Sequence, residues 1–193
     1  GRQNPAGRPV GIAVKISTSR RADILYPRRP AASRGGKGCC NMIFGAILAG
    51  GVGSRMHIAD MPKQFLPLGD KPIILHTLEK FLLCSRLDAV YVGVHPKWML
   101  HMQDLIEKHL PDRKADIHLV AGGGDRNDTI FHIVEQIEKD FGEDESHIIV
   151  THDSVRPFVT LRIIEDNSDA ALRCGACDTV VGATDTIVVS EDG

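Results

Sequence analysis

The sequence predicts an α/β fold, in which a mostly parallel sheet is covered by helices on both faces. From residue 42 onward, short apolar runs alternate with segments whose apolar residues recur at helical spacing. The 193 residues are 42% apolar and 25% charged, an ordinary balance for one globular domain with a sizeable core. No apolar run approaches the roughly 20 residues that a membrane span requires.

The expected elements follow one another as strand and helix. The first strand, 42–50, is a short apolar run closed by glycines, which is typical of a buried strand. The first helix, 72–84, begins with Pro72, a residue suited to a first helical turn. The same alternation then predicts strands at 89–95, 116–123 and 147–153, helices at 96–110, 126–141 and 161–174, and an extended segment at 178–190. Parallel strands joined by helices account for this order.

Charge divides the chain into two parts. Residues 1–41 carry nine Lys or Arg and one acid, Asp23, whereas 42–193 carry fourteen basic and twenty-four acidic residues. The first part is rich in Gly, Pro, Ser and Arg and has no sustained apolar period, so it has little to bury against the entropy of ordering. We expect 1–41 to be disordered or to be a non-native segment upstream of Met42, with a targeting or RNA-binding arm as the alternatives. The folded domain is expected at 42–193.

Three loops that carry glycine or charge each follow an expected strand. They are 49–63, 121–128 and 151–157. Because the carboxyl ends of parallel strands meet at one edge of the sheet, these loops are expected to lie together, and ligands of such sheets bind there.

The loop at 49–63, AGGVGSRMHIADMPK, suits a phosphate ligand. Its glycines allow backbone N–H groups to approach phosphate oxygens, while Arg55 and Lys63 supply positive charge. A dinucleotide-binding loop would need a third glycine after Gly51 and Gly53, and a P-loop would need Gly-Lys-Ser/Thr; the sequence has neither. The pattern therefore favours a nucleoside triphosphate that reacts at phosphorus.

Three ordered motifs, LAGGVGSRM…PKQFLPLG, GGGDRNDTI and THDSVRPF, resemble those of the sugar- and polyol-phosphate cytidylyltransferases. The resemblance covers essentially all of 42–190. It implies a Rossmann-like three-layer nucleotidyltransferase fold with the start of a dimerisation β-arm. It also implies transfer of CMP from CTP to a polyol phosphate with Mg²⁺, by a homodimer without nucleic-acid or membrane partners. Five ordinary cysteines suit a reducing cytoplasm.

The resemblance also implies roles for individual residues. The expected catalytic residues are Arg55 and Lys63 on the α- and β-phosphates, Asp153 near Mg²⁺ and the α-phosphate, and Arg156 on the acceptor phosphate. The expected nucleotide-binding residues are Ala49, Gly50, Gly51 and Gly53 along the phosphates, Gly122, Gly123 and Gly124 against cytosine, Arg126 and Thr129 holding that loop and the base, and Ser154 with its backbone near the ribose. Asp185 and Thr186 join Arg156 as acceptor-binding residues.

The acceptor is distinguished by the last extended stretch. Methylerythritol-phosphate enzymes of this family usually read Val-Arg-Asp-Thr there, whereas this chain reads Ala183-Thr184-Asp185-Thr186 and lacks the arginine that grips the substrate phosphate across the dimer interface. The segments HDSVRPFVT and VGVHPKW also resemble the ribitol-phosphate enzymes. The resemblance favours D-ribitol 5-phosphate, which gives CDP-ribitol for teichoic-acid or capsule synthesis. Methylerythritol phosphate of isoprenoid synthesis is the alternative.

A third alternative is a CTP-binding module that does not complete catalysis. Family members run some tens of residues further than Gly193 and include a phosphate-binding lysine near their end. We therefore expect 42–193 to be a nucleotidyltransferase domain truncated at its C-terminus.

Overall fold

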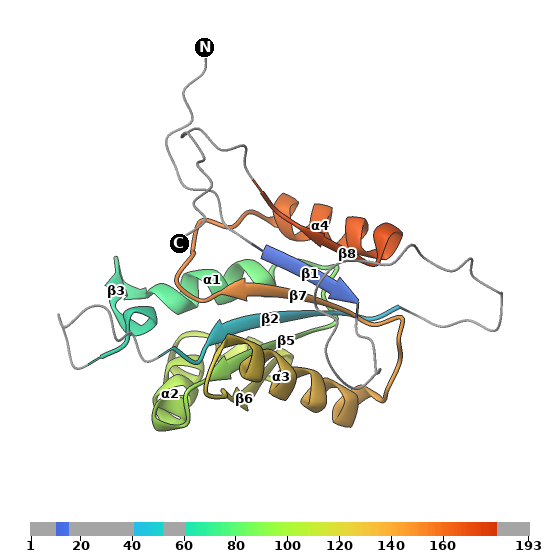
Figure 1. Ribbon diagram of the computed structural model, residues 1–193. Coiled ribbons are helices and arrows are strands. Elements are labelled where there is room, and N and C mark those ends of the chain that lie inside the picture. The colour runs from blue at the N-terminus through green and yellow to red at the C-terminus, as the bar shows by residue number, and fades with distance from the viewer. Residues whose placement is uncertain (1–10, 16–40, 52–60, 181–193) are drawn as a thin grey trace, which may run out of the picture.

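The computed structural model describes residues 11–15, 41–51 and 61–180, and its main sheet has the strand order β6-β5-β2-β7-β1-β8 (Figure 1). Four neighbouring strands are parallel: β6 (Ile117–Ala121), β5 (Ala89–Val94), β2 (Ile43–Ala49) and β7 (Ile148–Asp153). Successive connections run from β2 outward to β5 and β6, and the chain then returns to β7 on the other side of β2. In sheets of this kind, the crevice beyond the carboxyl ends at that reversal is the usual ligand site.

Helices cover both faces of the sheet, as Figure 1 shows. The described α-helices are α1 (Ile73–Leu82), α2 (Met99–His109), α3 (Arg126–Phe141) and α4 (Leu161–Cys174). Leu78 of α1, Met102 of α2 and Ile164 of α4 belong to one core cluster with one face of the sheet. Ile133 and Ile137 of α3 belong to the cluster on the opposite face. The predicted α/β fold with helices on both faces is confirmed.

Short elements refine the predicted boundaries. The helix expected at 96–110 begins with a 3₁₀ turn, η2 (Pro96–Trp98), because His95 Nδ1 accepts the N–H of Lys97 at 3.2 Å and so caps this turn. A second 3₁₀ turn, η1 (Lys63–Phe65), precedes a hairpin formed by β3 (Pro67–Leu68) and β4 (Lys71–Pro72). A third, η3 (Pro111–Asp116), leads into β6. None of the helices in the described part of the chain could cross a membrane.

One short strand lies within 1–41, the segment that the sequence predicts to be disordered or non-native. Strand β1 (Gly11–Lys15) lies in the main sheet, antiparallel to β7 and to β8 (Ala176–Asp178). Without it, one side of β7 would present a row of unpaired backbone groups, and GIAVK includes two β-branched residues that favour extended backbone. The low apolar content of the whole segment conceals this short run. The expected dimerisation arm falls in 181–193, outside the described residues.

Candidate functional site

A cavity of about 570 Å³ lies at the carboxyl ends of the parallel strands, where the loops that follow β2, β6 and β7 meet. The 3₁₀ turn η1 contributes a further part of its lining. Ten residues predicted for the site line this one cavity: Ala49, Gly50, Gly51, Lys63, Gly123, Gly124, Arg126, Thr129, Asp153 and Ser154. The three loops therefore share one site, as their positions after parallel strands predict.

The glycine-rich loop after β6 packs directly against the end of β2. A Cβ atom on Gly122 would lie 3.2 Å from the Cα of Gly50, and one on Gly50 would lie 2.9 Å from Thr129 Oγ1. At Gly123 a Cβ atom would lie 2.2 Å from the Cβ of Asp128, far closer than two non-bonded carbon atoms can approach. Side chains are excluded here by steric contact, and the backbone itself forms the wall of the cavity.

Hydrogen bonds fix this loop to the start of α3. Asp125 caps the helix, because its Oδ1 accepts the N–H of Asp128 at 2.9 Å. Thr129, which is buried, donates its hydroxyl to the Asp125 carbonyl at 2.9 Å and accepts the N–H of Gly123 at 3.1 Å. Gly122 N–H donates to the carbonyl of Val94 at 2.7 Å, behind the cavity wall. The loop is thereby held on both sides.

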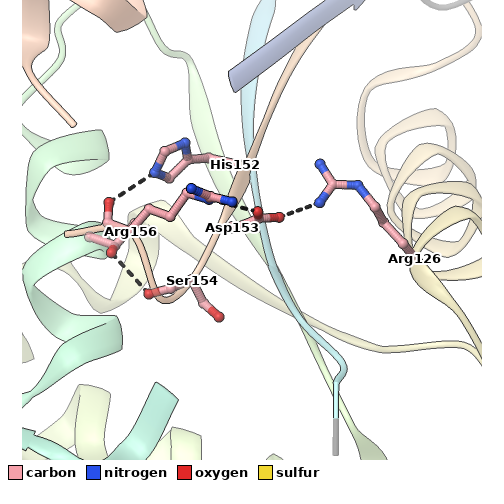
Figure 2. A network of polar contacts seen from close by, with 6 residues as sticks. Arg126, His152, Asp153, Ser154 and Arg156 are labelled. Atoms are coloured by element: carbon pink, nitrogen blue, oxygen red, sulfur yellow. Dashed lines mark hydrogen bonds and ion pairs between the residues drawn. The ribbon is translucent and has the colours of Figure 1, made fainter. Parts of the chain in front are cut away.

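Asp153 lies at the end of β7 between two arginines. Its Oδ1 accepts from Arg126 of α3, and its Oδ2 accepts from Nε of Arg156 at 2.9 Å (Figure 2). Burial alone would raise the pKa of this carboxyl, but the hydrogen bond from Arg156 and the charge and hydrogen bond of Arg126 outweigh it and hold the pKa below its ordinary value. Asp153 is therefore ionised at neutral pH, with both of its oxygens engaged.

Hydrogen bonds to buried groups fix the turn that follows Asp153. His152 Nε2 donates to the carbonyl of Arg156 at 3.0 Å, as Figure 2 shows, since a carbonyl oxygen can only accept. Burial lowers the pKa of His152, so the ring is neutral. Ser154 N–H donates to the Leu48 carbonyl at 3.2 Å, and its own carbonyl accepts from Thr77 Oγ1 at 3.0 Å. The N–H and the carbonyl of Ser154 are thus both bound within the protein, and the placement of its backbone near a ribose stays a prediction.

The residues present fit a Mg²⁺ ion that is held mainly by substrate. Mg²⁺ takes six oxygen ligands and is commonly bound by one or two carboxylates together with substrate phosphates and water. Over residues 11–15, 41–51 and 61–180, no group of three or more His, Cys, Asp and Glu side chains could hold a metal by itself. Asp153 offers one ionised carboxylate on the cavity wall, although Arg126 and Arg156 occupy its oxygens.

Some expected residues lie elsewhere. Arg156 is not among the lining residues, and its guanidinium instead bonds to Asp153. Gly122 does not line the cavity either, and its N–H donates to the carbonyl of Val94. The other expected residues fall outside the described residues: Gly53, Arg55, Asp185 and Thr186, together with Thr184.

Three polar lining residues were absent from the expected set: Gln64, His95 and Asp125. Two sequence signals could have found them. Gln64 directly follows Lys63, and His95 and Asp125 come directly after or close to the ends of the strands β5 and β6.

Curated proteins similar to this chain carry a functional name. The chain is 51% identical over 152 residues to a protein of Streptococcus pneumoniae serotype 2 (strain D39 / NCTC 7466) named ribitol-5-phosphate cytidylyltransferase. The alignment covers 79% of this chain and 65% of that protein, so the chain spans less than two thirds of the length of the curated relatives it matches.

Solved structures with the same fold include 4-diphosphocytidyl-2C-methyl-D-erythritol synthase from Anaerococcus prevotii DSM 20548. That structure has a TM-score of 0.63 at 22% identity and covers 79% of this chain and 60% of its own. The bifunctional IspDF from Campylobacter jejuni has a TM-score of 0.52 at 18% identity and covers 69% of this chain and 31% of its own. At these identities the likeness establishes the fold alone.

The family match covers most of the sequence. Residues 43–193 match the family described as "IspD: 2-C-methyl-D-erythritol 4-phosphate cytidylyltransferase". This range contains β2 and all the loops that line the cavity. The chain therefore belongs to the IspD family of cytidylyltransferases.

Proposed function

We propose that this protein transfers CMP from CTP to D-ribitol 5-phosphate and releases CDP-ribitol and pyrophosphate. The observation that carries the proposal is the cavity at the sheet reversal, where bare glycine backbone, Lys63 and the Asp153 carboxylate line one space. The 51% identity to relatives named ribitol-5-phosphate cytidylyltransferase supports the choice of acceptor over methylerythritol phosphate. The product would serve teichoic-acid or capsule synthesis in the cytoplasm.

The two sides of the cavity suit the two ends of CTP. On the β6 side, the backbone of Gly123 and Gly124 forms a narrow wall fixed by Thr129, which suits the flat edge of a pyrimidine. On the β2 side, Gly50 and Gly51 stand beside Lys63, which suits a triphosphate. Arg55, outside the described residues, would add a second cation on this side.

The reaction requires positioning and charge stabilisation more than proton transfer. The phosphate of the acceptor is already an anionic nucleophile at neutral pH, so the protein needs no general base. One of its oxygens would form a bond to the α-phosphorus of CTP while the bond to the pyrophosphate oxygen breaks in line with it. Lys63 and Arg55 would neutralise the charge that accumulates on the phosphates.

Asp153 and Arg156 would act on the acceptor side of this reaction. Mg²⁺, when bound, would draw negative charge from the triphosphate, and Asp153 would be its protein ligand. Arg156 uses Nε for Asp153, which leaves its two terminal nitrogens for the acceptor phosphate. The Asp153 carboxylate would thus orient the arginine that holds the nucleophile.

A homodimer is part of the proposal. The resemblance to this family implies that the arm, which begins in the last extended stretch, reaches the acceptor site of a second subunit. Asp185 and Thr186, outside the described residues, would then join Arg156 in binding the acceptor.

Release of pyrophosphate tests this function. We expect release with CTP and ribitol 5-phosphate, no release with CTP alone, and loss of release in Asp153→Asn. Arg162→Gln is the control, since Arg162 is an exposed arginine paired only with a carboxylate on its own helix. Release from CTP without an acceptor would indicate a hydrolase. Binding of CTP without release under any condition would favour the CTP-binding module.

A further inference from the structure

Gln64 bonds to two backbone carbonyls, one at the last residue of β2 and one in the loop that follows. Its Nε2 donates to the carbonyl of Ala49 at 3.0 Å and to the carbonyl of Gly51 at 3.3 Å. Only the NH₂ group of the amide can donate to two carbonyls, so the orientation of the amide is fixed by its partners. The side chain is 5% exposed and lines the cavity together with this loop.

The bond to the Ala49 carbonyl decides where the N–H group of the next residue, Gly50, points. In a trans peptide the C=O of one residue and the N–H of the next point in opposite directions. Because Gln64 holds the Ala49 carbonyl, the N–H of Gly50 is directed away from Gln64. Among the described residues, the N–H groups of Gly50 and Gly51 donate to no acceptor, although both glycines line the cavity. Two backbone donors thus have no partner among these residues, and Gln64 directs the first of them, the N–H of Gly50.

The amide is itself anchored. Gln64 is the middle residue of the 3₁₀ turn η1, in which Phe65 N–H donates to the Pro62 carbonyl at 3.0 Å. Phe65 is buried, and its ring lies 5.4 Å from that of Trp98 and 4.9 Å from that of His101, measured between centroids. A group that packs against α2 thus fixes the position of the amide relative to the loop.

We infer that Gln64 is a positioning residue for nucleotide binding, which turns the carbonyls of Ala49 and Gly51 aside so that the loop presents N–H donors to the phosphates of CTP. The inference rests on the proposed function. Two consecutive residues then have different roles: Lys63 supplies positive charge to the phosphates, and Gln64 orients the backbone that binds them. Without the amide, either carbonyl could turn toward the phosphates and repel them.

Comparing the Kd of CTP with the Kd of cytidine distinguishes this role from a general contribution to folding. In Gln64→Met the chain length is similar but no donor remains, and in Gln64→Glu a carboxylate faces the two carbonyls. We expect the Kd of CTP to rise at least about tenfold in both variants, as loss of oriented donors to a charged ligand predicts. The Kd of cytidine, which has no phosphate, should change by less than about twofold. Gln103→Met, on the exposed side of α2, is the matched control and should leave both values unchanged.

Equal weakening of CTP and cytidine, or unchanged CTP binding, would overturn the inference. Loss of the folded state in both Gln64 variants, judged by thermal melting, would also overturn it, because the residue would then support the fold and not the loop alone. If the unaltered protein binds cytidine but gains nothing from the triphosphate, the proposed function fails as well.

Discussion

Arg126, the first residue of α3, is bonded to the carboxylate of Asp153 at the end of β7 (Figure 2). This ion pair joins the glycine-rich loop after β6 to the turn after β7, and both residues line the cavity. The guanidinium has further N–H groups that this bond does not use. The pair therefore places one cation at a fixed point on the cavity wall beside the glycine-rich loop.

Replacing Arg126 tests whether this cation belongs to the binding site. In Arg126→Gln, we expect the KM for CTP to rise about tenfold, because a charged group that holds the glycine-rich loop and the base is lost. The melting temperature should change little, since the ion pair is partly exposed. Steady-state kinetics with Arg162→Gln as control measures this. A KM for CTP equal to that of the unaltered protein would mean that Arg126 serves only to hold Asp153.

Lys63 should affect the rate more than the fold. Lys63→Ala is expected to cost about 3 kcal/mol of transition-state stabilisation, or roughly a hundredfold in kcat/KM, as in sites where one electrostatic group is removed. Lys80→Ala, an exposed lysine on α1, is the matched control. Pyrophosphate release provides the rates and thermal melting the stability. Turnover that survives the loss of Lys63 would exclude it from the phosphate site.

Replacing either of two glycines of the cavity wall by alanine should affect the stability of the protein to very different extents. A Cβ atom on Gly123 would lie 2.2 Å from Asp128 Cβ and 2.9 Å from the Asp128 carbonyl carbon, whereas one on Gly51 would meet nothing within 4 Å. We expect Gly123→Ala to lower the free energy of unfolding by about 2 kcal/mol and Gly51→Ala by less than about 0.5 kcal/mol. Urea denaturation measures both. Similar values for the two variants would contradict the close packing of this loop on α3.

His152 should make stability depend on pH in a defined direction. Burial lowers the pKa of His152, and its bond to the Arg156 carbonyl and the charge of Asp153 oppose this only in part. The unfolded chain, with a histidine pKa of about 6.5, then binds more protons at this residue than the folded protein does. The contribution of His152 to the free energy of unfolding therefore falls as the pH decreases from about 6.5 through the lowered pKa. Above about pH 6.5 this contribution is constant.

The variant His152→Gln keeps a donor for the Arg156 carbonyl and removes the titration. We expect its free energy of unfolding to fall less between pH 7.5 and pH 5.5 than that of the unaltered protein, two pH values chosen to lie about one unit on either side of the histidine pKa. His109→Gln, a substitution outside the cavity, is the control. An equal fall in His152→Gln and in the unaltered protein would show that another group carries the pH dependence.

The parallel sheet and its helices could be predicted from hydrophobic periodicity. The apolar run at 42–50 and the helical spacing at 161–174 locate β2 and α4 closely, because each element must bury one face. The convergence of the loops after β2, β6 and β7 also follows from the sequence, since parallel strands end at the same edge.

Contacts between distant residues could not be predicted in this way. Strand β1 is placed by a backbone edge on β7, which composition does not reveal. The bonds of Gln64 to Ala49 and Gly51 depend on how η1 folds back on the loop, and the position of Gln64 after Lys63 places it near the site without indicating these partners. The engagement of the Ser154 N–H with Leu48 likewise arises from the register of β2 against β7. Site chemistry is thus easier to predict than the groups that orient it.

The ratio of kcat/KM for ribitol 5-phosphate and methylerythritol 4-phosphate, measured with CTP, tests the proposed function most directly. At position 184 this chain has threonine where methylerythritol-phosphate enzymes usually have a phosphate-gripping arginine. A missing charge-assisted contact disfavours a substrate that depends on it by about 1.5–3 kcal/mol. We predict that ribitol 5-phosphate is preferred at least about tenfold, which corresponds to about 1.4 kcal/mol. Equal use of the two acceptors, or a preference for methylerythritol 4-phosphate, would contradict the proposed substrate.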